Sequence, residues 1–194
     1  MKVYGITGLP GSGKSIISKF TENEGIHIIS MGDIVRKEAK TLNCSSEVAA
    51  VSLRKKYGNK IIAKLCVDEI QNISRESTDK QKRFQHEFED DIYIIEGIRS
   101  SHEVDVFREN FDDFTIIAIH SSPKTRFERL KKRNRSDDSS DFKTFLERDI
   151  RELEFGIGNV IASADFMIIN DDPIQDKLAQ MISEYNNEIN QSNQ

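Results

Sequence analysis

Eight consecutive residues combine amino acids that are suited to holding phosphate groups. The segment GLPGSGKS, from Gly8 to Ser15, has the spacing Gly-x-x-x-x-Gly-Lys-Ser, and it follows the apolar run KVYGIT. Glycines let the backbone turn sharply and aim successive N–H groups at one point. The segment SIISKF then continues as a helix, whose N-terminus adds partial positive charge at the same place. The pattern therefore predicts a phosphate-binding loop between a strand and a helix.

The residues of this loop are expected to bind ATP together with Mg²⁺. Lys14 can reach the β- and γ-phosphates, and the hydroxyl group of Ser15 can ligate the metal ion. The predicted ATP-binding residues are Gly8, Leu9, Pro10, Gly11, Ser12, Gly13, Lys14 and Ser15.

Length and composition restrict the class of protein. A chain of 194 residues suits one α/β domain, and a net charge of -5 argues against a broad nucleic-acid-binding surface. The two cysteines, Cys44 and Cys66, suit a reducing compartment. No apolar stretch approaches a membrane span, and no signal peptide precedes the first strand. We expect a cytoplasmic protein, monomer or homodimer, that binds neither nucleic acid nor membrane.

Five short apolar runs rich in isoleucine predict the strands. They are VYGIT, GIHIIS, DIYIIEG, FTIIAIH and DFMIIND. Nearly continuous β-branched runs separated by helical stretches predict an α/β fold, with a five-stranded parallel sheet covered on both faces. Ligands of such sheets bind at the carboxyl ends of the strands, so Gly8 to Ser15, Ser30 to Arg36 and Glu96 to Arg99 are expected around one crevice.

The stretch from residue 37 to 91 is polar and lacks a strand pattern. SSEVAAVSLRKKYG predicts a capped helix, and NKIIAKLCVDEIQNIS predicts a second one. We therefore expect a helical insertion between two strands of the sheet.

Four segments in order carry a family resemblance: GITGLPGSGKS, SMGDIVR, IIEGIRS and SSPKTRFERLKKRNR. They resemble the adenylate-kinase-like P-loop kinases. Over nearly the whole chain the sequence is similar to an archaeal adenylate kinase-related family, uncharacterised protein family 0200, which has no assigned reaction. The last strand also resembles that of dephospho-CoA kinases. The resemblance implies a P-loop NTPase fold of the nucleotide kinase type in one domain, 1–194, with an acceptor-binding insertion at 37–91 and a lid at 126–156.

The segment SMGDIVR resembles the acceptor-binding segment of adenylate kinases, which has threonine where this chain has Met31. Gly32, Asp33 and Arg36 match that segment. Asp33 and Arg36 are three residues apart on a nascent helix, so both can face the crevice, with Arg36 offering bidentate donors to a phosphate. Alternatively, Ser30 and Asp33 form a capping pair at the helix start. Both can hold at once.

The segment IIEGIRS resembles the end of the third strand of adenylate kinases, and it places Glu96, Gly97 and Arg99 in the site. Glu96 can hold the hydration shell of Mg²⁺, or it can accept a proton from a hydroxyl nucleophile. Gly97 lets the backbone approach a ligand. The alternative is a Glu96–Arg99 surface pair that closes the strand.

Basic residues gather in the fourth segment. Arg126, Arg129 and Arg133 fall on one helical face, and Arg129 and Arg133 match the Arg-x-x-x-Arg lid signature of these kinases. Arg148 and Arg151 resemble the returning side of the lid. Arginines from this group are expected to neutralise charge during transfer, although neighbouring glutamates could pair with any one of them.

Together these features predict a kinase that transfers the γ-phosphoryl group of Mg-ATP to a small phosphorylated metabolite, a nucleotide above all. The predicted catalytic residues are Lys14, Asp33, Glu96, Arg129 and Arg133. Two alternatives stay open: a dephospho-CoA kinase-like hydroxyl kinase, and a nucleotide-dependent switch or ATPase without a metabolite acceptor.

Overall fold

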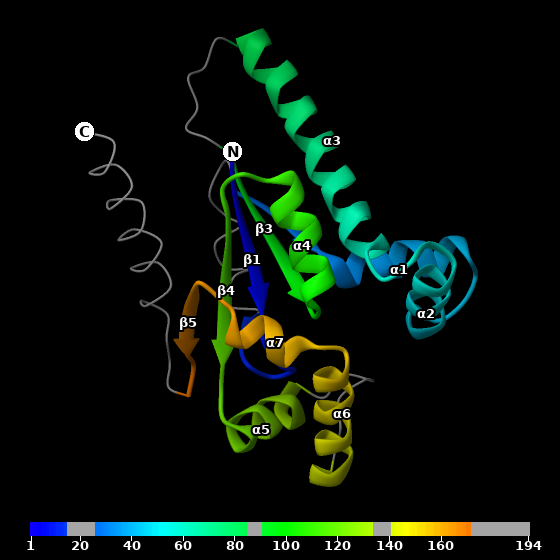
Figure 1. The fold of residues 1–194 in the computed structure, drawn as a ribbon, viewed down its shortest axis with the longest axis vertical. Helices are drawn as coiled ribbons and strands as arrows, with labels where there is room; N and C mark the ends of the chain where they lie inside the picture. The colour runs from blue at the N-terminus through cyan, green and yellow to red at the C-terminus, as the bar shows by residue number, and fades with distance from the viewer. Residues whose placement is uncertain (15–25, 85–90, 134–140, 172–194) are drawn as a thin grey trace.

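The computed structural model describes residues 1–14, 26–84, 91–133 and 141–171 (Figure 1). The strands are β1 (Lys2–Thr7), β2 (Ile26–Ser30), β3 (Ile92–Ile98), β4 (Phe114–His120) and β5 (Phe166–Ile169). They form one parallel sheet in the order β2-β3-β1-β4-β5. Each strand lies at a predicted isoleucine-rich run, so the predicted fold class is confirmed.

Helices connect the strands. They are α1 (Met31–Thr41), α2 (Ser46–Tyr57), α3 (Ile61–Phe84), α4 (Ser101–Asn110), α5 (Pro123–Arg133), α6 (Phe142–Glu154) and α7 (Ile157–Ala162). The two helices expected between residues 37 and 91 are α2, capped by the Ser45 side chain, and the longer α3. The helix expected to begin with SIISKF lies outside the described residues.

Alternate residues of the strands build two apolar clusters on opposite faces of the sheet. On one face Tyr93 and Ile95 of β3 pack with Phe107 of α4 and with Ile62 and Ile70 of α3. Helix α3 is therefore not only part of an insertion, because its first turns cover the sheet. A second cluster gathers on the other face from Tyr4, Ile6, Ile94, Ile117, Ile119 and Ile168.

The carboxyl end of β3 is irregular. Ile6 pairs with Glu96 and Thr7 pairs with Ile98, so Gly97 is an extra residue in β3 and adopts φ +95°. Such a bulge re-aims neighbouring side chains at a strand end, and its positive φ favours glycine. The Thr7 hydroxyl donates to the Ile98 carbonyl (2.9 Å), which fixes the two strand ends together.

The core makes a direct prediction for stability. Phe107 is fully buried, and Phe107→Ala should lower the free energy of unfolding by about 3–5 kcal/mol, because it removes apolar contacts and leaves a cavity. Urea denaturation followed by circular dichroism measures the change. Val51→Ala, at a position that is 63% exposed, is the matched control and should change it by less than about 0.5 kcal/mol. Equal losses in both variants would contradict this core assignment.

Candidate active site

The loop after β1 approaches its neighbours too closely for side chains at two of its glycines. A Cβ atom on Gly8 would lie 2.3 Å from the Ile119 carbonyl oxygen, and one on Gly13 would lie 2.0 Å from Nδ2 of Asn170. Both glycines have positive φ angles, +147° and +101°. Glycine is therefore required at these positions by space as well as by backbone conformation.

Polar residues after β4 and β5 hold the loop in place. The Ser12 carbonyl accepts hydrogen bonds from Asn170 Nδ2 (2.7 Å), Ser121 Oγ (3.1 Å) and Arg129 Nη1 (3.4 Å). The Asn170 backbone N–H donates to the His120 carbonyl (2.7 Å). Sequence reasoning did not find Ser121, whose only signal is its place directly after a buried strand.

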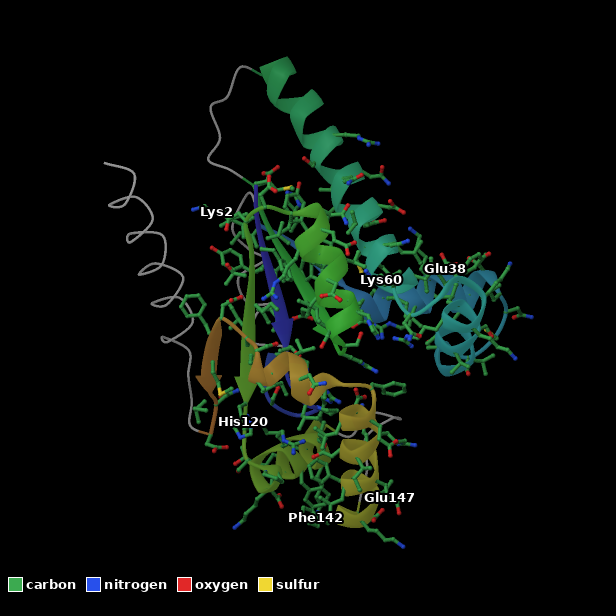
Figure 2. The ribbon with its side chains drawn as sticks, in the orientation of Figure 1. Lys2, Glu38, Lys60, His120, Phe142 and Glu147 are labelled. Atoms are coloured by element: carbon green, nitrogen blue, oxygen red, sulfur yellow. The ribbon has the colours of Figure 1, made fainter. Side chains whose placement is uncertain are left out.

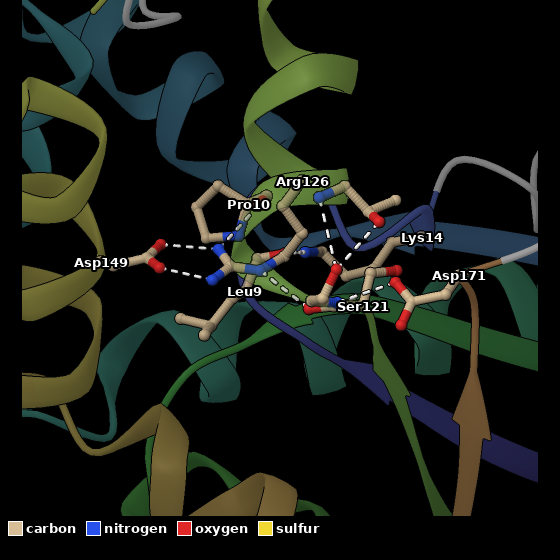
Figure 3. A network of polar contacts seen from close by, with 9 residues as sticks. Leu9, Pro10, Lys14, Ser121, Arg126, Asp149 and Asp171 are labelled. Atoms are coloured by element: carbon tan, nitrogen blue, oxygen red, sulfur yellow. Dashed lines mark hydrogen bonds and ion pairs between the residues drawn. The ribbon is translucent and has the colours of Figure 1, made fainter. Parts of the chain in front are cut away.

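Arg126 joins the same loop to α5 and α6 (Figure 3). Its guanidinium group donates to both carboxylate oxygens of Asp149 (2.8 and 2.5 Å), to the Ser121 carbonyl (3.1 Å) and to the Pro10 carbonyl (3.3 Å). It also lies 5.0 Å from the ring centroid of Phe145. Arg126 is buried, so it is a structural link, although the sequence grouped it with Arg129 and Arg133.

Lys14 lies where charged residues from several elements converge. Its Nζ donates to the Gly8 carbonyl and to the Leu9 carbonyl (3.1 Å). Burial lowers the pKa of Lys14 to about 8, and the charges of Arg99 and Arg133 act in the same direction while Glu152 and Glu96 oppose them. At pH 7 the amine is mostly protonated, and a polyphosphate would favour this charged form further.

Glu96 sits beside this lysine at the end of β3, in register with Ser30 of β2. Its Oε1 is buried and finds no hydrogen-bond partner among the residues that the structure describes. Burial raises the pKa of Glu96, an effect that the nearby Lys14 charge opposes and the Asp33 charge reinforces. An acid with an unsatisfied buried oxygen next to a lysine is suited to bind a metal-bound water or a proton.

Arg99 is held from two directions. Its Nη1 lies 3.4 Å from Oε1 of Glu152 on α6, so it pairs with α6 rather than with Glu96, the alternative that the sequence suggested. Its backbone N–H donates to Glu103 Oε2 (2.8 Å), and the buried Glu103 also lies 3.5 Å from Arg54 of α2. Sequence reasoning missed Glu103, although Ser100-x-x-Glu103 is a capping-box signal that marks it.

The predicted acceptor segment begins α1. The Ser30 hydroxyl accepts from the Asp33 backbone N–H (3.2 Å), which confirms the helix cap. Arg36 donates through Nε (2.9 Å) and Nη2 (2.5 Å) to Asp33 Oδ1, and these hydrogen bonds lower the pKa of Asp33. The Arg36 guanidinium lies against Gly32, where a Cβ atom would come within 3.2 Å of it. Asp33 and Arg36 thus form one exposed unit at the crevice.

A cavity of about 190 Å³ adjoins this unit. Isoleucine side chains of β2, α1 and α3 line it, together with Asp33, Lys37 and Glu69. It offers an apolar surface beside polar groups of both charges, as small-molecule sites commonly do.

The remaining predicted site residues lie around the loop or outside the described residues. Arg129 donates to Ser121 Oγ (2.9 Å) and to Asn170 Oδ1 (3.4 Å), so it lies against the loop. Arg148 and Arg151 are on α6. Ser15, the predicted magnesium ligand, lies outside the described residues.

Within the described ranges no cluster of three or more His, Cys, Asp or Glu side chains could hold a metal ion by itself. Mg²⁺ usually keeps several waters and binds through one or two protein groups plus substrate phosphates. The orphaned oxygen of Glu96 fits that manner of binding. Among the helices in the described parts of the chain, none has the length and apolar character needed to cross a bilayer.

Comparison with known proteins identifies relatives along nearly the whole chain. It is 46% identical to a UPF0200 protein of Methanothermobacter thermautotrophicus over 174 residues, which covers 90% of this chain and 84% of that protein. It is 44% identical to a UPF0200 protein of Methanocaldococcus jannaschii over 186 residues, covering 93% and 87% respectively. The chain belongs to the UPF0200 family. Residues 5–155 of this UPF0200 protein also match the family model of an AAA domain.

Solved structures with a similar fold include shikimate kinases. The shikimate kinase of Bacteroides thetaiotaomicron superimposes with a TM-score of 0.56 at 13% identity, covering 95% of this chain and 97% of that one. The shikimate kinase of Acinetobacter baumannii in complex with shikimate gives 0.54 at 10% identity, covering 95% and 92%. At such identities the likeness shows the fold alone, which is that of P-loop kinases.

The Arg126–Asp149 contact yields a prediction for the loop. Asp149→Ala should lower the free energy of unfolding by about 3–5 kcal/mol, because it leaves a buried guanidinium without its partner. ATP affinity should fall as well, since Arg126 also holds the Pro10 carbonyl. Chemical denaturation and calorimetric titration measure the two effects.

The matched control is Glu109→Ala, which breaks the exposed Lys60–Glu109 pair (3.1 Å) and should cost less than about 1 kcal/mol. A loss for Asp149→Ala no larger than that of this control would refute the structural role of the buried pair.

Proposed function

We propose that this UPF0200 protein is a Mg²⁺-dependent kinase that transfers the γ-phosphoryl group of ATP to a small phosphorylated metabolite, most simply a nucleotide. The observation that carries the proposal is the surroundings of Lys14. Glu96 of β3, Arg99 just after it and Arg133 of α5 are close enough to alter its pKa, as is a glutamate of α6. Phosphoryl transfer requires a lysine that binds the phosphates of the donor, with an acid and arginines close to it.

The loop and the arginines would act on the donor. Backbone N–H groups of the loop residues other than Pro10, together with the Lys14 side chain, would hold the β- and γ-phosphates, while Arg129 and Arg133 would neutralise charge that develops during transfer. Glu96 and Ser15 would hold Mg²⁺, which would offset the negative charge of the phosphates.

The unit formed by Asp33 and Arg36 would act on the acceptor. An acceptor phosphate would compete with Asp33 for the Arg36 guanidinium, and Arg99, two residues beyond Gly97, would offer it a second guanidinium. Gly32 leaves space for the Arg36 side chain to lie close to the backbone. We further propose that the protein works in the cytoplasm on small molecules, without nucleic acid or membrane.

One observation favours a second candidate, a kinase of a hydroxyl group. The pKa of Glu96 is raised, chiefly by burial, and its Oε1 has no hydrogen-bond partner in the described part of the chain. A carboxylate in this state is suited to take the proton of an attacking hydroxyl, whereas an acceptor phosphate is already ionised at neutral pH and needs no base.

The experiment that tests the kinase proposal is transfer of label from γ-labelled ATP to a panel of nucleoside monophosphates, nucleoside diphosphates and dephospho-CoA. We expect transfer to one class of acceptor, and a higher melting temperature with Mg-ATP because the ligand binds the native state. Lys14→Ala should abolish transfer and weaken ATP binding without unfolding the protein.

Lys60→Ala, a lysine in an exposed ion pair, is the matched control and should leave transfer unchanged. Unaltered ATP affinity of Lys14→Ala in calorimetry would refute the role of the loop. Steady ATP hydrolysis that no acceptor stimulates would instead support a nucleotide-dependent switch.

The two kinase candidates differ in which variant loses activity. For a phosphate acceptor, Arg36→Ala should raise KM for the acceptor and lower kcat, because bidentate contacts both bind and orient the nucleophile. For a hydroxyl acceptor, Arg36→Ala should leave KM and kcat near the wild-type values, while Glu96→Gln should lower kcat by roughly 10² to 10⁴ with little change in KM. Steady-state kinetics on the acceptor that the panel reveals distinguishes them.

The pH profile provides a second measurement. Since the pKa of Glu96 is raised, a base at this position becomes protonated at a higher pH than an ordinary glutamate, so kcat falls as the pH falls through that raised value. Glu96→Gln should abolish this acid limb. A limb that persists in the variant would exclude Glu96 as the base.

A further inference from the structure

Helix α6 carries a row of exposed apolar side chains. Phe142, Leu146, Ile150 and Leu153 recur at i, i+4, i+8 and i+11, and their exposed fractions range from 40% for Leu146 to 55% for Ile150. At 100° per residue they form one stripe, which we call the α6 stripe. Phe155, just beyond the helix, is also exposed.

The stripe is separate from the face of α6 that serves the site. Phe145, Asp149 and Glu152 form the buried face and contact α5, Arg126 and Arg99. The stripe lies roughly 90° round the helix from that face. Its first member is firmly placed, since the Phe142 ring lies 5.3 Å from the ring centroid of Phe127 and 5.6 Å from that of Phe145.

The side of α6 next to the stripe carries charged residues. In chain order they are Lys143, Glu147, Arg151 and Glu154. This order is complementary to itself when it is read backwards. Around a point between residues 148 and 149, Lys143 is about as far on one side as Glu154 is on the other, and Glu147 corresponds likewise to Arg151. A second α6 running in the opposite direction would therefore meet opposite charges along this edge, whereas in a parallel pair this edge would face the other flank of the partner helix.

We propose that the α6 stripe is the contact between two copies of this chain, with the two α6 helices antiparallel across a twofold axis near residues 148 and 149. Each copy presents the same surface, as a twofold interface requires. Leu146 of one copy then faces Ile150 of the other, and Phe142 faces Leu153. The stripe extends about 16 Å along the helix. A contact of that length buries less surface than a standard protein–protein interface, so we expect a reversible dimer of micromolar affinity.

Analytical ultracentrifugation of the full chain up to roughly 100 μM tests the contact. The wild type should pass from monomer to dimer as its concentration rises. The double variant L146E/I150E should remain a monomer with an unchanged circular dichroism spectrum, because it places four like charges in the contact. Val51→Glu, at an equally exposed apolar position on α2, is the matched control and should still dimerise.

Charge reversal tests the antiparallel register. Lys143→Glu alone and Glu154→Lys alone should each weaken the dimer by roughly tenfold, because like charges meet at both ends of the contact. The double variant K143E/E154K should restore it, an outcome that loss of helix structure could not produce. A wild type that stays monomeric at all concentrations, or a double variant without rescue, overturns the proposal.

Discussion

The buried pair between Arg126 and Asp149 is the contact on which the geometry of the candidate site depends. It closes α5 against α6, and the same guanidinium group reaches the carbonyls of Pro10 and Ser121. Buried ion pairs contribute little net stability, because desolvation offsets their attraction. The pair instead fixes positions. The loop after β1, α5 and α6 must adopt one arrangement before all donors of Arg126 have acceptors.

Charge around the loop is balanced rather than uniformly positive. Arg99 and Arg133 repel the ammonium group of Lys14, while Glu152 and Glu96 attract it. Burial already lowers the pKa of this lysine. Without the two glutamates, the two arginines would lower that pKa further and favour the neutral amine. The balance keeps Lys14 mostly charged at neutral pH in a site that still contains enough arginine to attract phosphates.

Three sides of helix α6 make different contacts. One side holds the phosphate-binding loop through Asp149, another holds Arg99 through Glu152, and the α6 stripe faces outward. The connection continues through Glu103, which binds the backbone of Arg99 and the side chain of Arg54 on α2. Figure 2 shows the side chains of the α1–α2 region above those of α5 and α6, on either side of the strand ends. Segments far apart in the sequence thereby meet at the carboxyl edge of one sheet.

Local chemistry explains which parts of the protein were predictable from its sequence. Spacings of a few residues determine the phosphate-binding loop, the five strands and the caps at Ser30 and Ser45. Such short spacings can be recognised directly in the sequence. The same holds for Asp33 and Arg36, three residues apart, which the structure joins in an ion pair. Membership of the UPF0200 family was recognisable for the same reason, because short motifs carry it.

Only the tertiary structure decided the partners of the buried polar groups. Asn170 binds the Ser12 carbonyl across 158 positions of sequence, and Arg126 binds Asp149 across 23. The sequence presented Arg126 as one more member of a basic helical face, and it left a pair between Glu96 and Arg99 open as an alternative. An arginine is buried with all its donors bonded, or exposed, according to the residues that pack against it. A linear pattern holds no information about partners that only the folded sheet brings within hydrogen-bond distance.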